Sequence, residues 1–241
     1  VTEYSAGDAV FGYTGLGFGA YATYKCMPSQ GLFHTKPKNL SFEESACMVN
    51  GALTALTYLR KKGKVGKGDT VLIYGTSGSV GTAAVQLSKY FGAHVTGVCS
   101  TKNVTLVKSL GADEVIDYLK EDFTQRQGKY DLIFDTIGKT SWSACKHILN
   151  PKGKYLLTEF GMSEIIKAVY YALFGKKKII ITSSNFYWKR EDLAFFKMMA
   201  EQGHFRSVVD TIYPIEKIAE AHQYVELGHK VGNVAISVSQ D

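Results

Sequence analysis

Apolar runs and amphipathic stretches alternate along the middle of the chain, between residues 70 and 184. Stretches with apolar residues at helical spacing lie at 78–91, 102–110, 119–126, 139–148 and 162–173. Strand candidates flank them, at 70–74, 94–98, 113–116, 130–135, 153–158 and 178–184. Strands that alternate with helices in this way form a parallel sheet with helices on both faces. The pattern therefore predicts an α/β fold with six parallel strands.

Crossover handedness determines how these six strands are ordered. Because successive crossovers are right-handed, we expect the order 3-2-1-4-5-6 of a doubly wound, Rossmann-type sheet. In such a sheet the ligand crevice lies beside the first strand, at the carboxyl edge. We assign residues 46–204 to this nucleotide-binding domain.

The flanking segments have a different pattern. Short strands are predicted at 7–12, 19–24 and 32–34, too few to close a barrel or a sandwich. Ser41 and Glu44 form a capping-box signature for a helical region that continues to about Gly63. Later elements are predicted at 190–202 (helix), 208–212 (strand), 215–227 (helix) and 233–239 (strand). We expect the last two strands to return to the β-rich start, giving an incomplete β domain from residues 1–45 and 205–241.

A glycine-rich turn follows the first strand of the predicted sheet. The window Thr76-Ser77-Gly78-Ser79-Val80-Gly81 is preceded by Gly75 and leads directly into a helix. A helix N-terminus in this position offers N–H groups and partial positive charge to a pyrophosphate. A strand-to-helix turn without a ligand is the alternative interpretation of the motif taken alone. A triphosphate P-loop is disfavoured because no Lys-Ser or Lys-Thr pair follows.

The end of the second strand indicates which dinucleotide is bound. An acidic residue there would hydrogen-bond the adenosine ribose and mark NAD, whereas this chain has Ser100-Thr101-Lys102. Hydroxyl groups and a cation suit a 2′-phosphate, so we favour NADP over NAD. A solvent-facing lysine is the alternative for Lys102. Asp135, at the end of the fourth strand, either caps the next helix or lies under the ribose and nicotinamide.

Composition excludes several classes of protein. The 241 residues have a formal net charge of +6, and the three-residue basic run Lys176–Lys178 is interpreted as a solvated loop rather than a nucleic-acid patch. No apolar stretch is long enough for a membrane span, and the chain opens without a signal peptide. Four widely separated cysteines argue against structural zinc and suit reduced thiols in the cytoplasm.

Catalytic chemistry is not evident in the pattern of residues. Tyr58 and Lys62 match a Tyr-x-x-x-Lys pair, but they precede the glycine loop instead of following it, so chance explains the match. The histidines and cysteines lack metal-ligand spacing. We nominate no general acid, general base or metal ligand.

Motifs in a characteristic order run along nearly the whole chain. They are Gly7–Gly12, Gly51–Ala55, Gly75–Gly81, Leu110–Tyr118, Tyr130–Asp135, Tyr213–His222 and Gly228–Gly232. In these motifs the chain resembles the zinc-independent quinone oxidoreductase branch of the medium-chain dehydrogenase/reductase superfamily. The resemblance implies that the β-rich segments belong to a GroES-like catalytic domain. It also implies NADPH-dependent hydride transfer to a quinone or an enone in the cleft between the domains.

The resemblance also suggests roles for individual residues. Ser77, Gly78, Ser79 and Val80, together with Thr76 in the same loop, would bind the pyrophosphate. The 2′-phosphate would be held by Ser100, Lys102 and Tyr118, and the nicotinamide ribose would lie near Thr54 and Ile137. Family members commonly form homodimers by pairing the last strand of the cofactor domain, here 178–184.

Three departures from the family pattern qualify what the resemblance implies. Residues 13–21 contain no cysteine where the zinc-using branch inserts a four-cysteine lobe, and Asn233 stands where a cofactor-contacting lysine is common. Family members also have further strands before Gly7. The chain is therefore expected to be a truncated form, a natural fragment or a diverged short form. A non-enzymatic NADPH-binding module is the alternative function.

Overall fold

The computed structural model describes residues 4–15, 19–182 and 188–238. The chain forms two compact units. We call Thr54–Phe186 the sheet unit, and Val1–Leu53 with Tyr187–Asp241 the flanking unit. These limits differ from the predicted boundaries after residues 45 and 204, since the helix that follows residue 189 belongs to the flanking unit.

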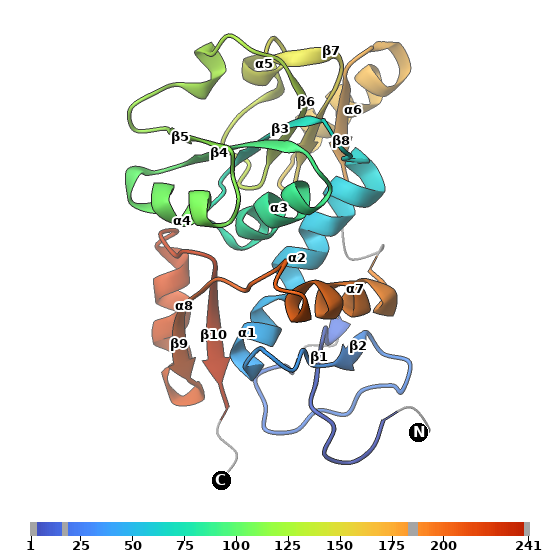
Figure 1. Cartoon of the computed structure of the whole chain (residues 1–241), viewed down its shortest axis with the longest axis vertical. Helices are drawn as coiled ribbons and strands as arrows, with labels where there is room; N and C mark the ends of the chain where they lie inside the picture. Colours follow the sequence, from blue (N-terminus) through green and yellow to red (C-terminus); the bar gives the residue numbers. More distant parts are fainter. Residues whose placement is uncertain (1–3, 16–18, 183–187, 239–241) are drawn as a thin grey trace. The chain divides into compact units, whose positions relative to one another are not determined.

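The sheet unit is built on six parallel strands (Figure 1). They are β3 (Thr70–Tyr74), β4 (His94–Cys99), β5 (Glu114–Asp117), β6 (Tyr130–Asp135), β7 (Leu149–Leu157) and β8 (Lys178–Ile181). Their order is β5-β4-β3-β6-β7-β8. This is the predicted 3-2-1-4-5-6 arrangement, and the predicted doubly wound α/β fold is confirmed. The end of the predicted strand 178–184 lies partly outside the described residues.

The central strand β3 shows why the sheet needs cover on both faces. Val71, Leu72 and Ile73 are all fully buried, although successive side chains of a strand point to opposite faces. Leu72 joins a buried cluster that includes Tyr155 of β7 and Ile179 of β8. The helices of this unit are α3 (Ser79–Tyr90), α4 (Val104–Ser109), α5 (Trp142–Cys145) and α6 (Met162–Phe174).

Two predicted helices of the sheet unit are wrong or much shortened. The segment 119–126 contains only a 3₁₀ turn, Phe123–Gln125, because the Asp122 side chain accepts the Thr124 N–H and closes a local turn. The segment 139–148 is reduced to α5, because Thr140 is held by the Asp135 carboxylate and Ser141 caps the helix. Local side-chain hydrogen bonds thus compete with the helical pattern at both places.

The helical region that begins at Ser41 is divided into three parts. The predicted capping box is confirmed in α1 (Phe42–Cys47), where Ser41 and Glu44 satisfy each other's backbone N–H groups. Next comes α2 (Val49–Leu56), followed by a π-helical turn, Thr57–Gly63. Lys64 ends the turn in the left-handed conformation with φ of 55°.

The flanking unit contains two separate two-stranded sheets in its described residues. Strands β1 (Val10–Gly12) and β2 (Phe33–Thr35) are antiparallel. Strands β9 (Val209–Pro214) and β10 (Asn233–Ser237) are parallel to each other and are connected through α8 (Ile218–Glu226). Strands β9 and β10 lie in the same unit as the β-rich start of the chain, where they pack on α1 and, among the described residues, do not hydrogen-bond to β1 or β2.

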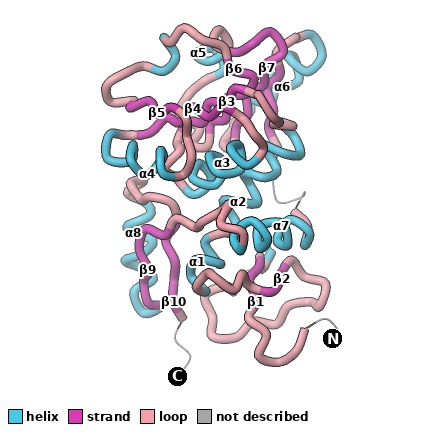
Figure 2. Tube along the Cα trace, viewed as in Figure 1, coloured by secondary structure: helices cyan, strands magenta, loops and turns pink. Residues whose placement is uncertain are grey.

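The predicted strand 19–24 is also wrong. Figure 2 shows these residues as loop, and most of their side chains are exposed. The remaining helix of this unit, α7 (Arg190–Glu201), packs against β2. In the described part of the chain, no helix is both long enough and apolar enough to cross a membrane.

Candidate cofactor-binding site

The glycine loop after β3 has a turn that only glycine can make at two positions. Gly75 has φ of +86°, and a Cβ there would lie 2.7 Å from the Thr136 hydroxyl oxygen. A Cβ on Gly81 would lie 2.1 Å from the Gly75 carbonyl oxygen, well inside any allowed contact. These two glycines therefore let α3 start immediately against the end of β3.

Gly78 has a more open environment than the other two glycines of the loop, Gly75 and Gly81. A Cβ at this position would meet a single atom within 4 Å, the Gly75 carbonyl oxygen at 3.6 Å. Gly78 is the N-cap of α3, and within the described residues no side chain caps the helix start. The loop thus leaves open space beside the positive end of a twelve-residue helix. This shape fits a pyrophosphate, whose oxygens require close backbone approach.

The predicted pyrophosphate residues separate into two groups. Ser77, Gly78, Ser79 and Val80 are partly exposed along the open side of the loop. Thr76 is fully buried below them, and its hydroxyl donates to the Val98 carbonyl at 3.0 Å. The backbone N–H groups of Gly75 and Thr76 donate to the same carbonyl, both at 3.2 Å. Thr76 therefore supports the loop by tying it to β4.

The ends of β4 and β5 bring the predicted 2′-phosphate residues to one corner. Cys99 of β4 is paired with Asp117 of β5, so Ser100 and Tyr118 leave the sheet side by side. The Tyr118 N–H donates to the Cys99 carbonyl at 3.0 Å, and the Tyr118 side chain is half exposed. Lys102 is exposed in the turn after Ser100 and forms no ion pair among the described residues.

The structure adds to this corner a carboxylate that the sequence reasoning did not consider, that of Asp117. It accepts the Thr101 hydroxyl at 2.5 Å and the Leu119 N–H at 3.1 Å, and Lys120 Nζ lies 3.6 Å away. The hydrogen bond from Thr101 is the main cause that lowers the Asp117 pKa. The NAD signature concerns an acid at the end of the second strand, whereas Asp117 ends the third strand. Its position at the carboxyl end of the predicted strand 113–116 is the signal in the sequence that points to this edge of the sheet.

Asp135 does not cap the next helix, and its place under the ribose and nicotinamide stays a prediction. The buried carboxylate accepts the N–H groups of Ile137, Gly138 and Thr140 at 3.0, 2.8 and 3.0 Å. Burial raises its pKa, although these hydrogen bonds act in the opposite direction. The helix that follows is capped by Ser141. Asp135 therefore fixes the loop after β6 at the carboxyl edge of the sheet.

Two further predicted contacts lie in the sheet unit. The Ile137 side chain covers Gly75, since a Cβ on that glycine would be 2.8 Å from Ile137 Cγ2. Thr54 is buried in α2, at the first position of the sheet unit. The loop after β6 thereby places Ile137 directly against the glycine loop.

Tyr58 and Asn233, to which the sequence assigned no functional role, make structural hydrogen bonds. The Tyr58 hydroxyl is buried and donates to the carbonyls of Leu157 and Thr182 at 2.6 and 2.8 Å. This geometry accounts for Tyr58 without a catalytic role. The Asn233 side chain donates to the Val208 carbonyl at 3.1 Å, joining β10 to the segment before β9.

The titratable groups show no evident metal centre. Among residues 4–15, 19–182 and 188–238, no three His, Cys, Asp or Glu side chains are grouped so that they could hold a metal ion. All four cysteines are free thiols, and burial raises the pKa of Cys47, Cys99 and Cys145 to about 11.

Comparison with known proteins identifies the family. A family model described as zinc-binding dehydrogenase matches residues 110–236, more than half of the chain. The chain belongs to this family. It lies within the medium-chain dehydrogenase/reductase superfamily, in the branch that contains quinone and enone reductases. The match begins just before β5 and includes β10.

Several relatives of this family are oxidoreductases by name. A chloroplast envelope quinone oxidoreductase homolog of Arabidopsis thaliana is 30% identical, covering 98% of this chain and 74% of its own. The 2-methylene-furan-3-one reductase of Solanum lycopersicum is 33% identical, covering 91% of this chain and 53% of its own. The chain thus spans between about half and three quarters of these relatives.

A solved structure gives the same result for the fold. The quinone oxidoreductase from Coxiella burnetii superposes with a TM-score of 0.87 at 26% identity, covering 98% of this chain and 74% of that one. The chain therefore has the fold of the oxidoreductases of this superfamily, whose members use nicotinamide cofactors.

Proposed function

We propose that the chain is the cofactor-binding part of an NADPH-dependent reductase that transfers hydride to a quinone or an enone. The observation that carries this proposal is the carboxyl edge of the sheet. There the open face at Gly78, the hydroxyl of Ser100 and the exposed charge of Lys102 follow neighbouring strands. The names of the quinone and enone reductases among the relatives support the substrate class.

Each part of the site has its own proposed role. The loop Ser77–Val80 would bind the pyrophosphate through its backbone and the start of α3. Ser100, Lys102 and Tyr118 would bind the 2′-phosphate, while the Asp117 carboxylate is hydrogen-bonded by Thr101 and lies 3.6 Å from Lys120 Nζ.

Catalysis in this proposal depends on positioning. The bound nicotinamide supplies the hydride, and the chain holds it close to the acceptor. Ile137, fixed by Asp135, and Thr54 would lie near the nicotinamide ribose. Residues 13–21 contain no cysteine, so the proposed reductase lacks the structural zinc lobe of the zinc-using branch. The flanking unit would be part of a GroES-like substrate domain.

A homodimer through β8 is part of the proposal. This strand lies at the edge of the sheet, and α6 before it leaves a stripe of apolar side chains exposed. Met162, Ile166, Val169 and Leu173 are between 56% and 70% exposed. Sedimentation velocity tests this proposal, and a monomer at all concentrations would contradict it.

The preference for NADPH can be tested by titrating both cofactors into the wild type and Lys102→Glu. We expect the wild type to bind NADPH more tightly than NADH, and the variant to lose about tenfold or more for NADPH alone, since a carboxylate repels the 2′-phosphate. Lys108→Glu, an exposed lysine of α4, is the matched control for net charge. Equal affinity of the wild type for the two cofactors would contradict the proposal.

A non-enzymatic NADPH-binding module is the second candidate, since the pattern of residues indicates no general acid or general base. Quinone-dependent NADPH oxidation by this chain and by a longer one distinguishes the two. Turnover in either supports the reductase. Cofactor binding without turnover in both would favour the module.

A further inference from the structure

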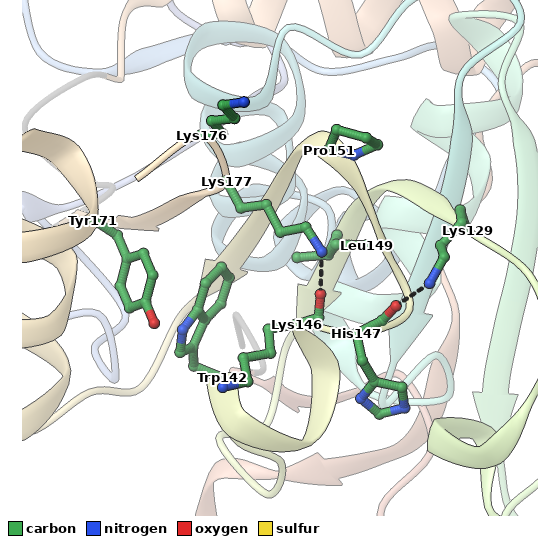
Figure 3. A pocket seen from close by; sticks show the side chains of 9 residues that line it. All are labelled: Lys129, Trp142, Lys146, His147, Leu149, Pro151, Tyr171, Lys176 and Lys177. Atoms are coloured by element: carbon green, nitrogen blue, oxygen red, sulfur yellow. Dashed lines mark hydrogen bonds between the residues drawn. The ribbon is translucent and has the colours of Figure 1, made fainter. Parts of the chain in front are cut away.

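A pocket of about 610 Å³ lies at the edge of the sheet opposite to the glycine loop (Figure 3). Leu149 is the first residue of β7, and Lys129 and Lys177 directly precede β6 and β8. Because all six strands are parallel, these residues mark the amino edge of the sheet, whereas the cofactor residues follow its carboxyl edge. The pocket is therefore separate from the candidate cofactor site.

Positive charge is concentrated in this pocket. Its basic lining residues are Lys129, Lys146, His147, Lys176 and Lys177. None of the residues that line it in the described part of the chain is an acid, and none of the four lysines forms an ion pair there. Two members of the run Lys176–Lys178, interpreted from the sequence as a solvated loop, thus line a pocket.

Backbone carbonyls hold two of these lysines in place. Lys129 Nζ donates to the His147 carbonyl, and Lys177 Nζ donates to the Lys146 carbonyl, so the two ammonium groups reach toward consecutive residues (Figure 3). Burial, followed by the charges of Lys129 and Lys146, lowers the pKa of Lys177. Carbonyls near the end of a helix are ordinary partners for lysines, so they explain the presence of Lys129 and Lys177 here. Lys146 and Lys176 line the same pocket, and these carbonyls do not explain their presence.

One wall of the pocket is apolar. Trp142 and Tyr171 pack edge to face with ring centroids 4.6 Å apart, and Leu149 and Pro151 also line the space. Trp142 is 7% exposed, and its indole Nε1 has no hydrogen-bond partner within the described residues. A pocket of this volume with mainly apolar walls and a few charged groups is typical of a small-molecule site.

We propose that this pocket binds an anionic amphiphile, a small molecule with an apolar body and one carboxylate or phosphate head. The head meets the lysines, which bind such anions as point charges. The body lies along Trp142 and Leu149, where burial of its apolar surface adds affinity. This site is independent of NADPH binding and of the proposed reduction.

Tryptophan fluorescence tests the proposal directly. The chain has two tryptophans, so Trp188→Phe leaves Trp142 as the single reporter. The probes are octanoate, octyl phosphate, octanol and inorganic phosphate. We expect saturable changes with octanoate or octyl phosphate, and at least tenfold weaker binding of octanol and inorganic phosphate. The response to octanoate relative to octyl phosphate identifies the preferred head group.

Two double variants, each replacing two lysines by glutamine, test whether the positive charge of the pocket is needed for binding. In the same background, Lys146→Gln with Lys176→Gln removes the two lining lysines that the carbonyls do not account for, and should weaken binding at least tenfold. Lys38→Gln with Lys108→Gln, two exposed lysines outside the pocket, should change it less than twofold. Raising the salt concentration should weaken octanoate binding to the unmodified pocket, a measurement that does not depend on the variant folding.

Three results would overturn the proposal. The first is octanol binding as tightly as octanoate, the second is inorganic phosphate binding as tightly as octyl phosphate, and the third is equal affinity in the two double variants.

Discussion

The two compact units are stabilised in different ways. In the sheet unit, β3 and its neighbours form a continuous ladder, and residues such as Val71 and Ile133 are fully buried. In the flanking unit, each sheet of the described residues has two strands, and Val10 of β1 and Ile212 of β9 are 39% and 50% exposed. A two-stranded sheet is marginal by itself, because it buries little apolar surface.

The flanking unit therefore depends on side chains from distant parts of the chain. Arg190 of α7 donates to the Tyr4 hydroxyl at 2.5 Å and to the Phe33 carbonyl at 3.3 Å. Its guanidinium also lies 5.6 Å from the ring centroids of Tyr4 and Phe33. Trp188 packs edge to face on Tyr13 at 4.8 Å. The sheet unit is thus stabilised by its backbone ladder, and the flanking unit by a few long-range side-chain contacts.

The largest expected loss of stability comes from a substitution in the sheet unit, at Gly81. Gly81→Ala places a Cβ 2.1 Å from the Gly75 carbonyl oxygen, so β3 and α3 must separate. We expect a loss of about 3 kcal/mol in the free energy of unfolding, the upper part of the range for overpacking. Chemical denaturation measures this loss.

Gly78→Ala is the control within the same loop, because its Cβ would be 3.6 Å from its nearest neighbour. We expect stability within about 0.5 kcal/mol of the wild type and weaker NADPH binding. Equal stability of the two variants would show that close packing at Gly81 does not hold the unit together.

A smaller effect is expected in the flanking unit from Arg190→Ala. Loss of its hydrogen bonds should cost about 2 kcal/mol, since bonds to charged groups are worth about 1.5–3 kcal/mol. Amide hydrogen exchange should accelerate in β2, next to Phe33, and remain unchanged in β3. Arg190→Lys keeps the charge but loses the planar fork, and should give an intermediate result. Equal acceleration in both strands would contradict the proposed difference between the units.

The smallest expected loss of stability comes from a pH-dependent contact of Asp113, the residue before β5. The Asp113 carboxylate accepts Lys89 Nζ at 2.8 Å and the Val95 N–H at 2.7 Å. Burial alone would raise the pKa of Asp113, but these hydrogen bonds outweigh it and lower the pKa. A lowered folded-state pKa stabilises the protein above the unfolded value, and this stability disappears as the pH falls.

Asp113→Asn should therefore cost about 1 kcal/mol near neutral pH. The difference from the wild type should shrink below about pH 4, where the carboxylate of the unfolded chain is protonated. Thermal unfolding at several pH values measures it. A difference that stays constant with pH would contradict an electrostatic origin.

The six strands of the sheet unit and their order were predictable from the sequence, although two of its helices were not. Alternation of strand and helix patterns located the strands, and the handedness of crossovers gave their order. The glycine spacing at Gly75, Gly78 and Gly81 likewise predicted a tight strand-to-helix turn, since each glycine acts on its immediate neighbours.

Only the tertiary structure decided how distant residues meet. It turned Thr76 inward to Val98, placed Asp117 beside Thr101 and gathered four lysines from three connections around Trp142. It also left residues 19–24 as a loop, because a strand requires a partner that the pattern of one segment does not supply. Apolar periodicity reports which residues are buried, whereas strand register and packing determine which side chains share a site.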